Sequence, residues 1–397
     1  MSLKNVLLSV FSIFICVSLH AASQWSQKAS FGGIGRHRPT GISIGTKVYL
    51  GLGHYNGTGT ETYLSDWWEF DPSSNSWTQK VDYPGNGGNG ELGAHGMGLE
   101  TVGYVGLGEI DDYGFYKYDP GTNTWTAMTE APSGGSFQDT GDFTIGHRGY
   151  FTRISSDQVY EYDADLDVWT GKGFTPFNVT YSFSGFAIGG KGYMKVSNSA
   201  CTVNTFWEYD PTSDIWVEKT PFPGLARLSS ISFVQNDKGY IVSGYGAGLH
   251  SDLSSEVWQY DPLMDTWSQL GDFIGTKRRY STGITLGNKC YLGTGTNGTN
   301  LNDFWEFDSA VAGQEDLFDA SSFAVFPNPA VDFVKFQSEK TLVFDLVIYS
   351  LSGRQISRVH TNTGSVHFER NGLSSGTYFY SVEVDGQKVH SDRFTFR

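Results

Sequence analysis

The sequence is poor in cysteine and in positive charge, and each shortage excludes a class of protein. Only three cysteines occur in 397 residues. Cys16 lies in an N-terminal apolar run, and the remaining two, Cys201 and Cys290, are too few for a disulfide framework. The chain carries 42 acidic and 27 basic residues, a formal charge of −15. Such a surface repels nucleic acid and anionic membranes, so we expect neither as a partner.

Motifs that mark common catalytic and metal sites are also missing. The sequence contains no His-Glu-x-x-His, no Gly-x-Ser-x-Gly, no calcium-binding EF-hand loop and no glycine-rich phosphate loop. We therefore predict no cofactor and no bound metal, and no catalytic residue can be assigned from a motif.

Long apolar runs are confined to the N-terminus. Lys4 precedes the apolar stretch of residues 6–19, which is too short to span a bilayer and ends in Ala21-Ala22-Ser23. This pattern predicts a signal peptide over residues 1–23. No other segment is apolar enough to be a transmembrane helix, so we expect an exported protein.

The dominant positive feature is a phrase repeated six times. Its copies are WWEFDPSSNSW, FYKYDPGTNTW, VYEYDADLDVW, FWEYDPTSDIW, VWQYDPLMDTW and a truncated FWEFDSAVAGQ. The aspartates recur every 44 to 51 residues, at positions 71, 119, 163, 210, 261 and 308. A period of this length with alternating aromatic and polar residues and Asp-Pro turns predicts an all-β, propeller-type fold.

A second repeat fixes the number of strands in each unit. A tyrosine-centred strand precedes every phrase, at Tyr49, Tyr104, Tyr150, Tyr193, Tyr240 and Tyr291. An earlier stretch rich in Gly and Ser predicts an inner strand, which gives four strands per unit and six units. The sixth phrase lacks its final tryptophan, whereas Gln24-Trp25-Ser26-Gln27 resembles the outer strand of the fifth unit. We expect this N-terminal strand to complete the sixth unit and close the ring.

These units resemble the kelch repeat, which pairs Y-x-x-G-x-G with W-x-Y-D-P and a final Trp. The resemblance covers residues 24–309 and implies a six-bladed kelch-type β-propeller. The usual Gly-Gly doublet is replaced by G-L-G, V-S-G or G-T-G, and the third and fourth units lack it. Kelch membership alone does not define a chemistry.

A different β-rich unit follows the repeats. Residues 310–321 are small and acidic and predict a linker. Residues 322–397 alternate hydrophobic stretches with Asn-Pro, Ser-Gly, Asn-Gly and Asp-Gly turns, which predicts a small antiparallel β-sandwich. The segments FPNPA, IYSLSGR and LSSGTY resemble the type A C-terminal sorting domain of type IX (Por) secretion in Bacteroidetes. The resemblance implies recognition by the type IX translocon, and release or surface attachment; a generic adhesion-type sandwich is the alternative.

The propeller mouth is where we expect a ligand. Counting thirteen to eleven residues back from each tyrosine, and adding the loops that follow it, gives the candidate ligand-binding residues Arg36, His37, Arg38, Glu91, Asp139, Tyr181, Arg227, Arg278, Arg279, Tyr280, His54, Glu109 and Arg153. Converging arginines in an acidic protein suit carboxylates or sulfates, and tyrosines suit sugars. The alternative is that the arginines join neighbouring blades through surface ion pairs.

Two functions follow from this mouth. The first is a secreted or cell-surface binding protein that recognises glycan or another extracellular protein. The second is an enzyme acting on an acidic sugar, because exported six-bladed kelch proteins resembling this one include N-acetylneuraminate epimerases. In that case Glu91, Glu109 or Asp139 would serve as acid or base beside Arg227 and Arg278.

Overall fold

A computed structural model describes residues 24–309 and 323–397, apart from residues 58, 60, 155, 181–183, 249–250, 339–342, 352 and 385–386. The expected signal peptide at residues 1–23 and the expected linker at residues 310–321 lie outside the described residues. No helix in the described part of the chain is long and apolar enough to cross a membrane.

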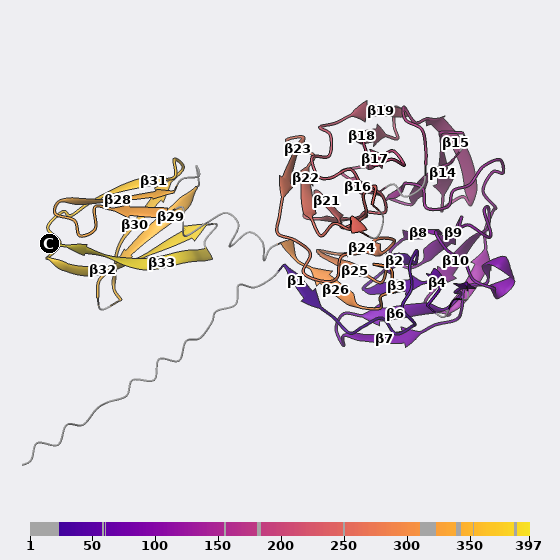
Figure 1. Cartoon of the computed structure of the whole chain (residues 1–397), viewed down its shortest axis with the longest axis horizontal. Helices are drawn as coiled ribbons and strands as arrows, with labels where there is room; N and C mark the ends of the chain where they lie inside the picture. Colours follow the sequence, from indigo (N-terminus) through magenta and orange to yellow (C-terminus); the bar gives the residue numbers. More distant parts are fainter. Residues whose placement is uncertain are drawn as a thin grey trace, which may run out of the picture.

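Residues 25–307 form six four-stranded antiparallel sheets arranged in a ring (Figure 1). We number these sheets as blades one to six. Blade one contains β2 (Thr40–Ile44), β3 (Lys47–Gly51), β6 (Trp67–Asp71) and β7 (Ser76–Gln79). Blade two contains β8 (His95–Gly98), β9 (Gly103–Gly106), β10 (Phe115–Asp119) and β11 (Thr124–Ala127). Blade three contains β12 (Asp142–Ile145), β13 (Arg148–Thr152), β14 (Gln158–Asp163) and β15 (Val168–Phe174).

Blades four to six repeat the same order from the axis outward. Blade four contains β16 (Ser184–Ile188), β17 (Lys191–Ser197), β18 (Asn204–Asp210) and β19 (Ile215–Glu218). Blade five contains β20 (Ile231–Gln235), β21 (Lys238–Val242), β22 (Val257–Asp261) and β23 (Thr266–Gln269). Blade six contains β24 (Thr282–Leu286), β25 (Lys289–Gly293), β26 (Phe304–Phe307) and β1 (Trp25–Gln27). A small hairpin of β4 (His54–Tyr55) and β5 (Thr62–Tyr63) and a short 3-10 turn, η1 (Gly85–Gly88), lie in the connections.

The repeated phrase holds neighbouring blades together through one clamp. An Asn or Asp lies four residues after the turn aspartate of each of the first five phrases. Its side-chain oxygen accepts a hydrogen bond, 2.8 to 3.2 Å long, from a backbone N–H of the segment that leaves the preceding blade. The pairs are Asn75 with Ala29, Asn123 with Val81, Asp167 with Thr129, Asp214 with Gly173 and Asp265 with Thr220. All five Asn and Asp residues have φ between 51° and 57°. Asn and Asp tolerate this left-handed backbone better than other side chains do.

The final tryptophan of the phrase completes the clamp. The indole Nε1 atoms of Trp77, Trp125, Trp169 and Trp267 donate to the carbonyls of Ala29, Val81, Thr129 and Thr220, at 2.9 to 3.1 Å. One residue between blades is thus bound through both its N–H and its C=O. The repeated phrase therefore connects each blade to the one before it, and the spacing of the phrases in the sequence equals the length of one blade.

The N-terminal strand closes the ring, as expected from the sequence. Trp25 pairs with Phe307 and Gln27 pairs with Trp305 in antiparallel register, so β1 is the outer strand of blade six. The Trp25 side chain is only 3% exposed, and its ring centre lies 4.7 Å from that of Phe273 and 4.8 Å from that of Phe307. This pairing removes a free sheet edge.

The C-terminal unit is a two-sheet antiparallel structure of seven described strands. One sheet contains β27 (Phe323–Phe326), β28 (Phe333–Ser338) and β31 (Ser365–Glu369), and the other contains β30 (Gln355–Thr361), β29 (Phe344–Tyr349), β32 (Gly376–Val384) and β33 (Gln387–Phe396). Phe336 lies 5.0 Å from Tyr380 and 5.5 Å from Phe394, ring centre to ring centre, which joins the two sheets in one core. The prediction of an all-β chain is confirmed.

The closure can be tested by replacing Trp25 with Ala. The variant leaves a cavity among aromatic rings, and we expect the free energy of unfolding to fall by about 3–5 kcal/mol in urea denaturation. Leu263→Ala is the control, because Leu263 is 89% exposed and its loss should change stability by less than about 0.5 kcal/mol. Equal denaturation midpoints for Trp25→Ala and the parent protein would contradict the closing role of β1.

Candidate functional site

Three of the expected mouth arginines are buried instead of facing a ligand. Arg36, Arg227 and Arg278 are 0%, 1% and 0% exposed. Each is paired within its own blade: Arg36 with Asp66 at 2.5 and 2.7 Å, Arg227 with Glu256 at 2.6 Å, and Arg278 with Asp303 at 2.7 and 2.6 Å. Because their charges are neutralised away from solvent, the prediction that these three form an anion-binding funnel is wrong.

These arginines instead lie at the junctions between blades. The carbonyl of Arg36 accepts the N–H of Gly295 at 2.8 Å, and the carbonyl of Arg278 accepts the N–H of Gly244 at 3.1 Å. The carbonyl of Arg227 accepts a hydrogen bond from the Lys195 ammonium or amine nitrogen. The side chain thus binds one blade and the backbone binds its neighbour. The alternative of surface ion pairs between blades is also wrong, because the ion pairs are buried and lie within one blade, and the contact with the neighbouring blade is made by the backbone.

Glu91 occupies the same offset and has the same structural role. Its carboxylate is 0% exposed and accepts the backbone N–H groups of Leu92, Ile110 and Asp111 at 2.7 to 2.9 Å. Burial raises the pKa of Glu91, although these three hydrogen bonds oppose the shift. With all its acceptor capacity directed at the backbone, Glu91 does not face the mouth.

A further expected mouth residue, Arg153, is buried and bound to neighbouring loops. Arg153 is 6% exposed; its guanidinium donates to the carbonyls of Pro132 and Ser133 at 3.0 Å and lies 4.4 Å from the centre of the Tyr160 ring. It therefore links two loops. Tyr181 lies outside the described residues.

The residues that do face the axis come two positions later in the repeat. Eleven residues before the tyrosines, one residue from each of five blades lines a cavity of about 140 Å³. We call this set the entrance ring: Arg38, Gly93, Asp139, Ser229 and Tyr280. All five have φ between 50° and 64°. Backbone hydrogen bonds join Asp139 to Gly93, Gly93 to Arg38 and Arg38 to Tyr280 at 2.8 to 3.2 Å. Three of these residues, Arg38, Asp139 and Tyr280, were predicted from the sequence, but that prediction also included the two preceding offsets and did not select Gly93 or Ser229.

An ion pair crosses the entrance ring from blade one to blade three. Arg38 Nε lies 3.0 Å from Asp139 Oδ2, and a terminal guanidinium nitrogen lies 3.6 Å from Glu109 Oε2. Burial opposes the charge on Arg38, but Asp139, Tyr280 and Glu109 together outweigh burial, so the pKa of Arg38 is raised. Burial raises the pKa of Asp139, and Arg38 counteracts this. Gly93 makes room for the pair, since a Cβ there would lie 2.8 Å from Asp139 Oδ1.

Tyrosines border the ion pair on the side of blades five and six. The Arg38 guanidinium lies 4.4 Å from the centre of the Tyr280 ring, and Arg279 lies 4.9 Å from the rings of Tyr245 and Tyr280. The hydroxyls of Tyr245 and Tyr280 are 3.3 Å apart. Burial alone would raise the pKa of Tyr280, but hydrogen bonding to Tyr245 and Arg38 lowers it. Hydrogen-bond donors and acceptors therefore both line the entrance.

The two expected histidines lie at the seam between blades one and six. His37 Nδ1 is 2.9 Å from Asn300 Oδ1, and His37 Nε2 is 3.1 Å from His54 Nδ1. His54 in turn pairs with Glu61. Burial lowers the pKa of His37 to about 4, so this imidazole is neutral near pH 7. The two histidines thus help to connect blade one to blade six, beside Arg38.

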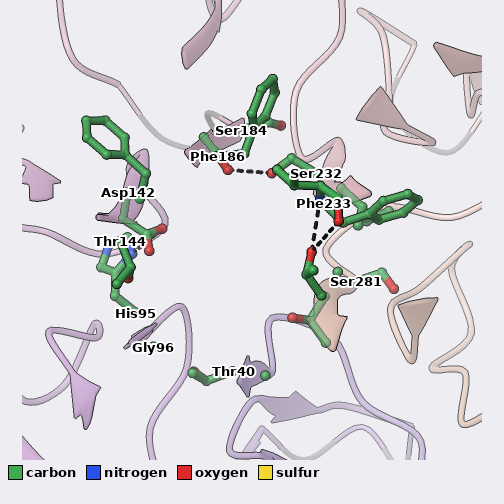
Figure 2. Close-up of a pocket in the computed structure, with 18 of the residues that line it drawn as sticks. Thr40, His95, Gly96, Asp142, Thr144, Ser184, Phe186, Ser232, Phe233 and Ser281 are labelled. Carbon is green, nitrogen blue, oxygen red and sulfur yellow. Dashed lines mark hydrogen bonds and ion pairs between the residues drawn. The ribbon is translucent and has the colours of Figure 1, made fainter. Parts of the chain in front are cut away.

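Below the entrance ring, the inner strands of all six blades surround an axial cavity of about 510 Å³ (Figure 2). Its wall is rich in hydroxyls, and some of these donate hydrogen bonds to backbone carbonyls of a neighbouring blade. Ser232 Oγ donates to the Gly185 carbonyl at 2.7 Å, and Ser184 Oγ donates to the Ser230 carbonyl at 2.7 Å. The cavity is therefore polar and mostly uncharged.

One charged pair lies in this wall, and the sequence analysis did not select it. His95 Nδ1 is 2.9 Å from Asp142 Oδ1, and His95 Nε2 is 2.6 Å from the Phe137 carbonyl oxygen. Since both ring nitrogens face acceptors, the histidine is held as an imidazolium. A signal was present: Asp142 stands where the other blades have Gly41, Gly96, Gly185, Ser232 and Gly283.

The charge on His95 gives a testable dependence of stability on pH. Burial lowers the pKa of His95, but Asp142, the Phe137 carbonyl and Asp139 together outweigh burial, and the pKa is raised. The stabilisation is therefore complete below the unfolded value of about 6.5 and is lost as pH rises through the folded value. We expect the difference in unfolding free energy between the parent protein and His95→Gln to be widest near about pH 6 and to narrow at alkaline pH. A difference that is constant with pH would show that His95 is held neutral.

Comparisons with known proteins agree with this architecture. Residues 324–394 match the family described as the secretion system C-terminal sorting domain. The N-acetylneuraminate epimerase of Salmonella typhi is 30% identical over 115 residues, which are 28% of this chain and 30% of the epimerase. The epimerase of Salmonella typhimurium strain LT2 is 30% identical over 116 residues, with the same coverage. The matched part of the chain thus spans less than a third of the length of these relatives.

A solved structure, that of YjhT, has a similar fold. The TM-score is 0.56 at 15% identity, and the match covers 70% of this chain and 95% of YjhT. Identity this low speaks to the fold alone. Together, the comparisons and the ring of sheets show a β-propeller followed by a secretion-system C-terminal sorting domain, which directs the chain through type IX export to the cell surface or the medium.

Proposed function

We propose that this protein is an exported glycan-binding propeller whose ligand enters at the ring formed by Arg38, Gly93, Asp139, Ser229 and Tyr280. The observation that carries the proposal is the presence of a fixed donor, Arg38, and a fixed acceptor, Asp139, at this ring, above a polar cavity of about 510 Å³. A few convergent polar groups at a concave site are the usual basis of ligand selection. We further propose that the six sheets are kelch-type blades within residues 24–309, preceded by a signal peptide at 1–23 and followed by a linker at 310–321 and a sorting unit at 322–397.

The balance of charge at the entrance favours a neutral sugar over an acidic one. Arg38 pairs with Asp139 and lies near Glu109, while Arg279 lies against the rings of Tyr245 and Tyr280. The two arginines and the two acids together carry no excess positive charge. The three arginines that could have supplied excess positive charge are buried in blade junctions. Vicinal hydroxyls of a saccharide can both donate to the carboxylates and accept from the guanidinium and phenol groups.

An enzyme acting on an acidic sugar is the second candidate, and one observation favours it. The relatives that match this chain are N-acetylneuraminate epimerases, although over less than a third of their length. In such an enzyme Glu109 and Asp139 would be the acid and base groups, because Glu91 is fully engaged with the backbone. Conversion of free N-acetylneuraminate between its anomers, followed by NMR, distinguishes an epimerase from a binding protein.

Binding at the entrance can be tested with Arg38→Lys and Tyr280→Leu in the secreted protein. Lysine keeps the charge but loses the planar fork that contacts Asp139 and a ligand together. We expect each variant to weaken binding of neutral oligosaccharides about tenfold or more in calorimetric titration. Arg148→Lys is the control, because Arg148 is half exposed and pairs with Asp163 at the hairpin end of blade three. Unchanged affinity in both entrance variants would place the glycan elsewhere.

Export is tested separately by truncation. Deleting residues 322–397 should leave a propeller that folds, because the sandwich has its own aromatic core. We expect the truncated chain to accumulate in the periplasm, as judged by fractionation and by protease protection in intact cells. Delivery of the truncated chain to the surface at the normal level would contradict the role of the sorting unit.

A further inference from the structure

Asp142 is placed to contact a ligand inside the axial cavity. It begins the inner strand β12 and lines both the axial cavity and the smaller cavity at the entrance ring. Its side chain is 32% exposed. In Figure 2, Asp142, Thr144 and His95 lie on one wall, and Ser232 and Ser281 lie on the opposite wall.

One carboxylate oxygen of Asp142 is occupied, and the other is open. Oδ1 lies 2.9 Å from His95 Nδ1. Within the described ranges, Oδ2 has no hydrogen-bond or ion-pair partner. An oxygen in this position can accept two hydrogen bonds from a ligand without displacing any contact of the protein.

The orientation of Asp142 is fixed from behind. His95 is 5% exposed, and its Nε2 lies 2.6 Å from the Phe137 carbonyl and 3.3 Å from Thr140 Oγ1. The His95 ring also packs edge-on against Phe151, with ring centres 5.5 Å apart. Since the imidazole cannot rotate without losing these contacts, the carboxylate is held in place before a ligand arrives, which reduces the cost of binding.

From this geometry we propose that Asp142, positioned by His95, forms a binding subsite for the hydroxyls of a neutral terminal sugar that has passed the entrance ring. The inference rests on the proposed function and deepens it. The imidazolium balances the carboxylate, which removes the net charge that would attract a cation. Oδ2 is an acceptor only and has no proton to donate to a carboxylate or sulfate, so an acidic terminal sugar is disfavoured. Hydroxyls donate to Oδ2, and the serines and threonines of the opposite wall supply further partners.

The experiment compares Asp142→Asn with the parent protein, in the full secreted chain. The probes are lactose, cellopentaose, maltopentaose, xylopentaose and 3′-sialyllactose, titrated by calorimetry. Asparagine preserves the shape and still accepts from His95, but it loses the charge-assisted hydrogen bonds to the ligand. We expect about a tenfold to hundredfold weaker affinity for whichever neutral probe binds. Asp165→Asn is the matched control, because the Asp165 side chain is 69% exposed and lies in the turn between β14 and β15.

A second variant keeps the test independent of the charge on Asp142. Thr144→Met narrows the cavity beside Asp142 and should cause a similar loss of affinity, with folding checked by thermal unfolding. If Arg38→Lys weakens binding while Asp142→Asn and Thr144→Met do not, the subsite is wrong and the entrance site stands. If no probe binds the parent protein, the proposed function and the subsite both fail. Preference for sialyllactose over lactose would also overturn the subsite.

Discussion

The rest of this structure depends on the clamp that the Asn or Asp of five repeated phrases, and the final Trp of four of them, make on the preceding blade. The aromatic residues of each four-stranded sheet are buried in cores that they share with the neighbouring blade. The clamp fixes the outer edges of neighbouring blades, with the same two hydrogen bonds recurring around the ring. The inner strands are thereby held at a constant radius, which leaves the axial cavity open. Where the repeat ends, β1 replaces the clamp by strand pairing.

Near the axis, a second set of bonds joins the blades and brings charged groups into the interior. At the junctions after blades one, five and six, a glycine N–H binds the carbonyl of the next blade. After blade two, His95 takes this role, and after blade four, Lys195 does. Burial lowers the pKa of Lys195 well below its usual value, whereas Asp142 keeps His95 charged. The pKa values of two side chains with the same role are thus shifted in opposite directions, because only His95 has a carboxylate partner.

The sequence predicted the architecture well because the repeated features are local. Aspartate spacing, strand alternation and the match between Gln24-Trp25-Ser26-Gln27 and the fifth outer strand each depend on a few neighbouring residues. The order of strands, the closing role of β1 and the separate C-terminal sandwich followed from them. The sorting domain was recognisable for the same reason, since its turn motifs are contiguous.

The site was predicted less well because backbone conformation and burial decide it. Arg36 and Arg38 differ by two positions, yet one is buried against Asp66 and the other faces Asp139 across the axis. The left-handed backbone at Arg38, Asp139 and Tyr280 turns these residues inward, and no residue preference marks it, because Arg and Tyr rarely adopt positive φ. Acids that pair with the arginines lie about thirty residues away, so the pairing needs the fold. The only sign of Asp142 in the sequence was that the other five blades have Gly or Ser at the equivalent position.

The most direct measurement is a crystal structure of the secreted protein soaked with a neutral oligosaccharide that it binds. Our account predicts electron density for a terminal sugar on the propeller axis, with hydroxyls within hydrogen-bond distance of Asp142 and the following unit between Arg38 and Tyr280. Density for the same sugar on the outer strands or on the hairpin face, with an empty axis, would contradict it.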